Sequence, residues 1–342
     1  MTLEIIGLDR NRPIVAAEFA ACRDLVTALA LSSTTSDASA FGDERKWLVG
    51  DIDPPVPVYR GFASFSLGDF NYDFVRQLRQ HCYIFTGYRL SDIVTGKKTL
   101  SWTDIESYPM QDLYPEDWSV PFHLIMEQQV PPDLVCDPPL VAGEVGYDVK
   151  GRCINRDVVS YQGRVLLLNL VGAIERLRRL EHPRILEIGG GYGGLAYFLT
   201  RFIPHASYTI VDLPSSLMYA GCYLAVAQHS HPVVVLDGAG PTAPHVTLAP
   251  NFMAGRLADR RFDLAINTLS FTEMPEDVVR SYGELIAETL APGGQLFEQN
   301  YQGPASGEDE GFPVSVLKRI FPVRRPIEGF SFFGTARLWS LT

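Results

Sequence analysis

The sequence predicts a doubly wound α/β fold, and three observations support this prediction. In the second half of the chain, short apolar segments alternate with amphipathic ones, as in a parallel sheet whose crossover connections are helices. Five glycines follow the first of these apolar segments, in RILEIGGGYGGLAYFLTR at residues 184–201. Acidic residues end the next two segments. Because ligands bind such sheets at the carboxyl ends of the strands, we expect a ligand site there.

The strands and helices are expected to alternate along the chain from the glycines onward. Strands are predicted at ILEI, SYTIVD, PVVVLD, RFDLAINTL and GGQLFEQNY, and the helices between them near residues 195–202, 215–228 and 275–290. The stretch between PVVVLD and RFDLAINTL has the texture of an irregular insertion. Near the end of the chain, VRRPIEGFSFFGTARLWSL predicts an antiparallel strand pair at the edge of the sheet.

A long helix is expected just before the first strand, from about residue 157 to residue 180. Asp157 is its predicted N-cap, and Arg176, Arg178 and Arg179 lie near its C-terminal end, where positive charge complements the helix dipole. Earlier in the chain, helical spacing of apolar residues predicts helices at 15–31 and 67–88. Prolines and glycines at 53–61 and 130–139 indicate irregular connections between these elements.

Composition excludes several classes of function. The 342 residues include 29 basic and 40 acidic side chains, which give a net charge of −11 without a basic cluster, so we expect no nucleic-acid partner. The N-terminal residues lack a signal-peptide pattern and no apolar run approaches the length of a membrane span, so we expect a cytoplasmic protein with no membrane partner. The five cysteines form no CxxC pair and are expected to be buried thiols.

The glycine cluster fits two cofactors. Gly189, Gly191 and Gly194 satisfy the GxGxxG pattern of dinucleotide sites. Glu187, Gly189, Gly191 and Gly193 satisfy the acidic-x-GxGxG pattern of enzymes that use S-adenosyl-L-methionine (SAM). Asp212, at the end of the second strand, suits the ribose of either cofactor. The cluster alone therefore leaves both cofactors open.

Three further features favour SAM. Glu187 stands inside a strand, where a dinucleotide fold normally has an apolar residue and where a carboxylate can meet the methionine amino group of SAM. Asp237 ends the expected third strand and can approach the adenine edge or the ribose. LAPGGQLFEQ resembles the entry to the fifth strand of SAM-dependent methyltransferases, which commonly finish with a reversed strand like the one expected here.

Four motifs carry a more specific resemblance. EIGGGYGGLA, IVDLP, NTLSFTEM and INRDVVSYQGRV resemble the sugar O-methyltransferases of the nanchangmycin-pathway type, which belong to the class I SAM-dependent methyltransferases. The resemblance covers residues 146–300. It implies a Rossmann-like sheet, SAM as cofactor and methylation of a sugar hydroxyl on a natural product. It implies little about the acceptor itself.

The different textures of the two halves of the chain, mainly helical first and then alternating strands and helices, set the expected domain organisation. Residues 151–342 are expected to form the SAM-binding methyltransferase domain, and residues 1–150 a mainly helical extension or domain that shapes an acceptor pocket or a homodimer interface. The residues expected to bind the cofactor are Glu187, Gly189, Gly191, Gly193, Asp212, Leu213, Asp237 and Asn267, together with Tyr161 and Arg164 on the preceding helix. Arg164 suits the SAM carboxylate, because a guanidinium makes two charged hydrogen bonds; the alternative is an arginine on the helix surface.

Methyl transfer to an aliphatic hydroxyl calls for a general base near the methyl group. Glu273, in NTLSFTEMPED after the fourth strand, is the first candidate, and the alternative is that it caps or salt-bridges the helix that opens at Pro275. His123, in SVPFHLIMEQQ, is the second candidate, since the half that carries it is expected to cover the active site; the alternative is a packed or surface histidine.

We expect no required metal, because the dense acidic run at 308–310 lies in a glycine-rich stretch typical of a solvated loop. The sequence thus predicts a SAM-dependent O-methyltransferase that acts on a small molecule, a sugar or a polyketide-linked sugar. Three alternatives stay open: a C- or N-methyltransferase on a small metabolite, a NAD-dependent oxidoreductase, and a noncatalytic SAM-binding protein. NADH binding would identify the second of these, and cofactor binding without turnover the third.

Overall fold

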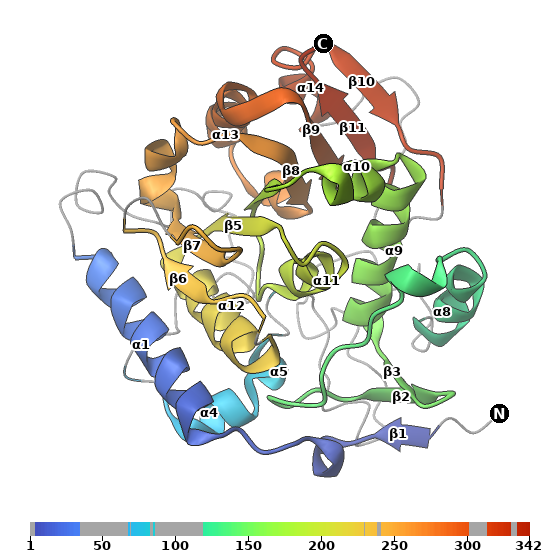
Figure 1. The fold of residues 1–342 in the computed structure, drawn as a ribbon, viewed down its shortest axis with the longest axis vertical. Helices are drawn as coiled ribbons and strands as arrows, with labels where there is room; N and C mark the ends of the chain where they lie inside the picture. Colours follow the sequence, from blue (N-terminus) through green and yellow to red (C-terminus); the bar gives the residue numbers. More distant parts are fainter. Residues whose placement is uncertain are drawn as a thin grey trace, which may run out of the picture.

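The computed structural model describes residues 4–34, 68, 70–82, 85, 119–228, 230–237, 241–300, 313–329 and 334–342. The main sheet of this part of the chain has eight strands in the order β10-β11-β9-β8-β4-β5-β7-β6 (Figure 1). The six strands that are adjacent in the order β9-β8-β4-β5-β7-β6 are parallel to one another, and β11 is antiparallel to both β9 and β10. The strands are β4 (Arg184–Ile188), β5 (Ser207–Asp212), β6 (Val233–Val235), β7 (Val246–Pro250), β8 (Phe262–Thr268), β9 (Leu290–Gln299), β10 (Val323–Pro326) and β11 (Arg337–Ser340).

Helices cover both faces of this sheet, as the doubly wound prediction requires. Side chains alternate between the faces along each strand, so Ile185 and Leu186 of β4 belong to two different buried cores. The first core is completed by α1 (Ala16–Ser32), α9 (Arg156–Leu170), α10 (Ala173–Arg179), α11 (Gly194–Phe202) and α12 (Pro214–Ala227). The second is completed by α13 (Glu276–Thr289), α14 (Val314–Leu317) and the 3-10 helix η7 (Asn251–Leu257). The doubly wound α/β prediction is confirmed, with the reversed strand next to β9.

The helix expected from residue 157 to residue 180 is two helices, and its predicted N-cap is wrong. Asn155 caps α9, because its side chain accepts a hydrogen bond from the backbone N–H of Val158 at 3.0 Å. Asp157 lies in the first turn, and its carboxylate is buried. Gly172, with φ of 76°, then separates α9 from α10. A left-handed residue ends a helix, and glycine adopts that conformation at little cost.

The expected irregular insertion contains a strand. β7 is formed by VTLAP, all five residues are buried, and the strand lies in the sheet between β5 and β6. The apolar run is short and ends in a proline, so it gave no periodicity from which to recognise a strand. As a result, β6 is the outermost strand and not the direct neighbour of β5.

The N-terminal segments pack onto the same body. α1 lies along α12, and β1 (Glu4–Ile6), β2 (Gly146–Val149) and β3 (Arg152–Ile154) form a separate small sheet (Figure 1). The expected boundary between residues 150 and 151 falls in the turn that joins β2 to β3. The remaining short elements are η1 (Leu8–Arg10), α4 (Tyr72–Arg76), α5 (Leu78–His81), α8 (Ser119–Glu127), η6 (Pro132–Leu134) and η8 (Ser270–Glu273).

All five cysteines are buried free thiols, as the sequence predicted. Across the part of the chain that the structure describes, no helix has the length and apolar character needed to cross a bilayer.

Candidate functional site

The glycine cluster forms a tight loop between β4 and α11. Gly189, Gly191 and Gly193 have φ values of 75°, 55° and 84°, in the left-handed region where a side chain would be strained. The N–H of Gly189 donates to the carbonyl of Val211 at 2.8 Å, which holds the loop against the end of β5. A Cβ atom on Gly189 would collide with the side chain of Ser270. The predicted loop is therefore present at the carboxyl edge of the sheet, with its backbone held close to the neighbouring strands.

Asp212 joins the end of β5 to this loop. Its carboxylate accepts hydrogen bonds from the N–H of Gly191 at 3.0 Å and of Leu213 at 2.7 Å. Loss of solvent raises the pKa of Asp212 to about 6, although these backbone hydrogen bonds lower it. A carboxylate has lone pairs for about four hydrogen bonds, and the hydrogen bonds from Gly191 and Leu213 leave the others for ribose hydroxyls, although the Gly190 N–H and the Ser216 hydroxyl also face the carboxylate and lower its pKa.

Glu187 and Arg164 place opposite charges beside the loop. Glu187 is buried in β4 and accepts a hydrogen bond from the Tyr208 hydroxyl at 2.9 Å. Burial raises its pKa to about 7, while Tyr208 and the nearby Arg164 charge lower it. Arg164 of α9 is itself 5% exposed, so the surface alternative is wrong, and its Nε donates to the side-chain oxygen of Gln299 at 3.2 Å. This arrangement complements an α-amino acid, whose ammonium and carboxylate carry the opposite charges.

Tyr161 lies one turn before Arg164 and packs against the end of the loop. A Cβ on Gly194 would collide with the Tyr161 ring, whose centroid is 5.4 Å from the Arg164 guanidinium carbon and 5.9 Å from the Tyr192 centroid. The aromatic ring thus forms a wall between α9 and the first turn of α11. Leu213, the N-cap residue of α12, is half-buried beside Asp212.

Asn267 lies at the predicted edge, but its amide is engaged with protein groups. Its Nδ2 donates to the carbonyl of Ile188 at 3.0 Å and to the Ser270 hydroxyl at 2.7 Å, and its Oδ1 accepts from Nδ2 of Asn300 at 2.8 Å. Both amide protons are therefore used to hold the carboxyl ends of β4, β8 and β9 together. Leu269, just after β8, has a φ of 68°, so this edge also carries backbone strain.

Glu273 ends η8 and is half-buried on the same edge. Burial first, and then the negative charge of Asp212, raise its pKa to about 7. The helix α13 begins after Pro275 without a side-chain cap, and the hydrogen bonds and ion pairs of the described residues include none to the Glu273 carboxylate. The capping and salt-bridge alternatives are thus not seen in the described part of the chain.

His123 does not come to this edge. A Cβ on Gly163 of α9 would lie 3.4 Å from the sulfur of Met126, so α8 packs on α9 near Gly163. Tyr161 precedes Gly163 by two residues, which is about 200° around α9, so Tyr161 faces the loop from the other side of this helix. His123 is buried on the Gly163 side of α9, and burial lowers its pKa. The charged groups that act on it there are Arg152, Glu127, Asp137 and Lys150. The expectation that His123 lies over the active site is therefore corrected.

Asp237 also requires a correction. It is exposed after β6, at the rim of a cavity of about 830 Å³ that α1 and α12 help to line, and β7 separates its strand from β5. The place beside Asp212 belongs to Asn251, which directly follows β7. Asn251 is 4% exposed, and neither its amide nitrogen nor its amide oxygen has a hydrogen-bond partner among the described residues. The sequence signal for Asn251 is that a polar residue directly follows an apolar run. This signal is useful only when VTLAP is recognised as a strand.

Within the described ranges, no three histidine, cysteine or acidic side chains gather as a metal site. The acidic run at 308–310 lies outside the described residues.

Comparison with known proteins gives partial matches. No family model matches the sequence. The release factor glutamine methyltransferase of Deinococcus radiodurans is 49% identical over 49 residues, which are 14% of this chain and 18% of that protein, so the chain spans less than a fifth of this relative.

Solved structures of methyltransferases align with about half of the chain. An O-methyltransferase family protein from Burkholderia thailandensis is 12% identical with a TM-score of 0.36, over 54% of this chain and 60% of that one. Human methyltransferase-like protein 13, solved with S-adenosylhomocysteine (SAH), is 22% identical with a TM-score of 0.36, over 52% and 80%. The mitomycin 7-O-methyltransferase is 14% identical with a TM-score of 0.33, over 53% and 55%. The strand order of this chain, with β11 reversed beside β9, is that of a Rossmann-like α/β fold.

Proposed function

We propose that this protein transfers a methyl group from SAM to a hydroxyl group of a small molecule, and that the acceptor is a sugar or a polyketide-linked sugar. The observation that carries the choice of cofactor is the buried pair of Glu187 and Arg164 beside the glycine loop. A dinucleotide has no amino-acid end for this pair to bind, whereas SAM has one. The sugar acceptor rests on the sequence resemblance.

Residues at the carboxyl edge, together with Arg164 of α9, match the methionine end, the ribose and the adenine of SAM in turn. Glu187 and Arg164 complement the ammonium and carboxylate of the methionine end, and Asp212 offers acceptor capacity to the ribose hydroxyls. Asn251, with both amide atoms unpartnered among the described residues, matches the donor and acceptor on the adenine edge. When bound, SAM supplies a methyl group that is already activated for displacement by a nucleophile.

The protein's remaining tasks are to align the acceptor, exclude water and remove a proton. Glu273 is the proposed general base. Its pKa of about 7 leaves a large fraction of the carboxylate ionised at neutral pH, and no described residue donates a hydrogen bond to it. It can therefore accept the proton of the acceptor hydroxyl as the new C–O bond forms. Asn267 acts as a positioning residue, since it fixes the strand ends on which Glu187 and the glycine loop are carried.

The test is methyl transfer itself. The purified protein is incubated with SAM that carries an isotopically labelled methyl group and with a panel of glycosides, polyketides, amines and activated carbon acids. We expect label to appear in hydroxylated glycosides, with the methylated oxygen located by NMR. Label on nitrogen or carbon would replace the O-methyl proposal by one of its alternatives. Binding of SAH without transfer to any acceptor would support a noncatalytic SAM-binding protein.

A further inference from the structure

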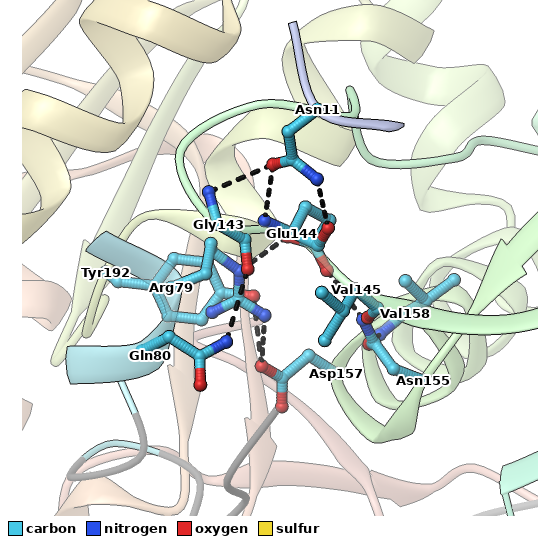
Figure 2. A network of polar contacts seen from close by, with 10 residues as sticks. All are labelled: Asn11, Arg79, Gln80, Gly143, Glu144, Val145, Asn155, Asp157, Val158 and Tyr192. Atoms are coloured by element: carbon cyan, nitrogen blue, oxygen red, sulfur yellow. Dashed lines mark hydrogen bonds and ion pairs between the residues drawn. The ribbon is translucent and has the colours of Figure 1, made fainter. Parts of the chain in front are cut away.

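A buried charge cluster lies behind the glycine loop and takes no part in the proposed chemistry. Arg79 of α5 is 1% exposed; its Nε donates to Oε2 of Glu144 at 2.6 Å and its Nη2 donates to Oδ2 of Asp157 at 2.6 Å (Figure 2). Asn155 donates to the other oxygen of Glu144 at 2.6 Å. A buried ion pair repays its desolvation only where hydrogen bonds satisfy its members, as they do here. The cluster joins α5, the turn before β2 and the start of α9.

The turn that carries Glu144 is fixed from the N-terminal end of the chain. The backbone takes left-handed φ values of 56° at Ala142 and 85° at Gly143. Oδ1 of Asn11 accepts hydrogen bonds from the N–H groups of Gly143 and Glu144, both at 3.0 Å, and its Nδ2 donates to the Glu144 carbonyl at 2.6 Å (Figure 2). The N–H of Arg79 donates to the Ala142 carbonyl at 2.9 Å. Segments far apart in the sequence therefore hold the cluster in one arrangement.

The cluster reaches the glycine loop through one side chain. Tyr192 is the single residue with a side chain in the run 189–194, and it is 2% exposed. The guanidinium carbon of Arg79 lies 4.0 Å from the centroid of the Tyr192 ring, and the Tyr192 hydroxyl donates to Oδ2 of Asp157 at 3.3 Å (Figure 2). The ring of Tyr223 packs edge-on against it at 5.0 Å. A desolvated guanidinium over a tyrosine face is one of the stronger side-chain contacts of this kind.

Glycine loops lose more conformational entropy on ordering than other segments, so their shape needs an external anchor. Next to Tyr192, the N–H of Gly191 holds the Asp212 carboxylate, and Gly193 is the N-cap residue of α11. A change in the position of Tyr192 therefore moves both the amide that orients Asp212 and the start of the helix.

We propose that Arg79 is a positioning residue: through Tyr192 it fixes the glycine loop in the conformation that binds the cofactor, although it does not belong to the carboxyl edge itself. This inference rests on the proposed function for the identity of the ligand. It also means that residues before position 151 support the cofactor site, because Arg79 and Glu144 both come from that part of the chain.

The test must separate positioning from general stability. Replacing Arg79 alone leaves two buried carboxylates without a cation, which destabilises the fold strongly. The triple variant Arg79→Met, Glu144→Gln, Asp157→Asn removes all three charges together and is expected to keep a melting temperature near that of the wild type. A second variant, Tyr192→Leu, keeps the ion pairs and removes the ring. Tyr192→Phe is the conservative variant, and Arg179→Met, which breaks the exposed Arg179–Glu175 pair on α10, is the control.

Two readouts are taken for each variant: the Kd for SAH by calorimetry, and hydrogen–deuterium exchange of the amides of residues 189–194 without ligand. We expect at least tenfold weaker binding and faster exchange for the triple variant and for Tyr192→Leu, near wild-type values for Tyr192→Phe, and unchanged values for Arg179→Met. If the triple variant or Tyr192→Leu folds and leaves both readouts at wild-type values, the inference is overturned.

The two proposals fail separately. If the wild type does not bind SAH, the proposed cofactor is wrong, and the exchange rates alone then decide on Arg79. Faster loop exchange in the triple variant and in Tyr192→Leu than in Arg179→Met supports positioning, and exchange in the triple variant equal to that in Arg179→Met contradicts it.

Discussion

Two buried polar regions meet at the glycine loop, and they differ in how their groups are satisfied. In the Arg79 cluster, Arg79, Asn155 and Tyr192 all donate to the two carboxylates. At the carboxyl edge of the sheet, Asn251 has no hydrogen-bond partner among the described residues, and burial raises the pKa of the carboxyl of Glu273. A buried polar group without a partner costs stability. The satisfied region therefore holds the fold, and the unsatisfied edge keeps its capacity for a ligand.

The largest effect expected at the unsatisfied edge is on turnover. Glu273→Gln removes the proposed base and should lower kcat by about 10²-fold or more, the usual contribution of a positioned base. In the wild type, kcat/KM should rise with pH through about 7 and then level, because the base must be ionised. The variant should lose this rise. Glu276→Gln, an exposed neighbour on α13, is the matched control. A wild-type pH profile in the Gln variant would exclude Glu273 as the base.

Removal of the Asp212 carboxylate should cost about 3 kcal/mol in cofactor binding, since two charged hydrogen bonds to ribose are lost. Asp212→Ala is therefore expected to raise the Kd for SAH by about 100-fold in a calorimetric titration. Asp237→Ala is the matched control, because this exposed acid follows the outermost strand β6. Equal losses in the two variants would contradict the placement of the ribose beside β5.

This pair of variants also shows what the sequence could predict. Glu187, Asp212 and the glycines belong to a local motif, so their spacing along the chain was enough to place them together. Asp237 was assigned wrongly because its neighbour in the sheet depends on β7, a strand with no periodic pattern. The Arg79 cluster could not be predicted at all, since its ion pairs join residues 65 and 78 positions apart. The parallel fold and the reversed β11 followed from the order of apolar segments; the long-range polar pairs required the packed structure.

A smaller loss of affinity is expected at Asn251. Asn251→Leu removes the unpartnered amide after β7 and should weaken SAH binding about tenfold, the usual value of one or two neutral hydrogen bonds. The stability of the ligand-free protein should not fall, since the amide makes no hydrogen bond with the described residues. Thr247→Val is the matched control: its buried hydroxyl on the same strand is also unpartnered among the described residues but lies away from the strand end. The control should leave the Kd unchanged, and a similar loss in both variants would remove Asn251 from the adenine site.

The smallest effect expected is on stability. The folded-state pKa of Glu187, about 7, lies above the usual value for an unfolded chain. At a pH between these two pKa values, the native state therefore binds more protons than the unfolded chain does. Its contribution to stability therefore falls as pH rises from about 4 to about 7. Glu187→Gln should be as stable as the wild type near pH 4 and more stable above pH 7, by about 1–3 kcal/mol or a few degrees in Tm.

Thermal unfolding across this pH range measures the difference, and Glu284→Gln, exposed on α13, should show none. A variant that is less stable than the wild type at pH 8 would mean that Arg164 stabilises the ionised carboxylate more than burial destabilises it.

The most direct test of the central claim is a calorimetric titration of the wild-type protein with SAH and, in parallel, with NADH. A site built around Glu187, Arg164 and Asp212 predicts micromolar binding of SAH and no binding of NADH under the same conditions. Binding of NADH in place of SAH would contradict the methyltransferase proposal and identify the glycine loop as a dinucleotide site.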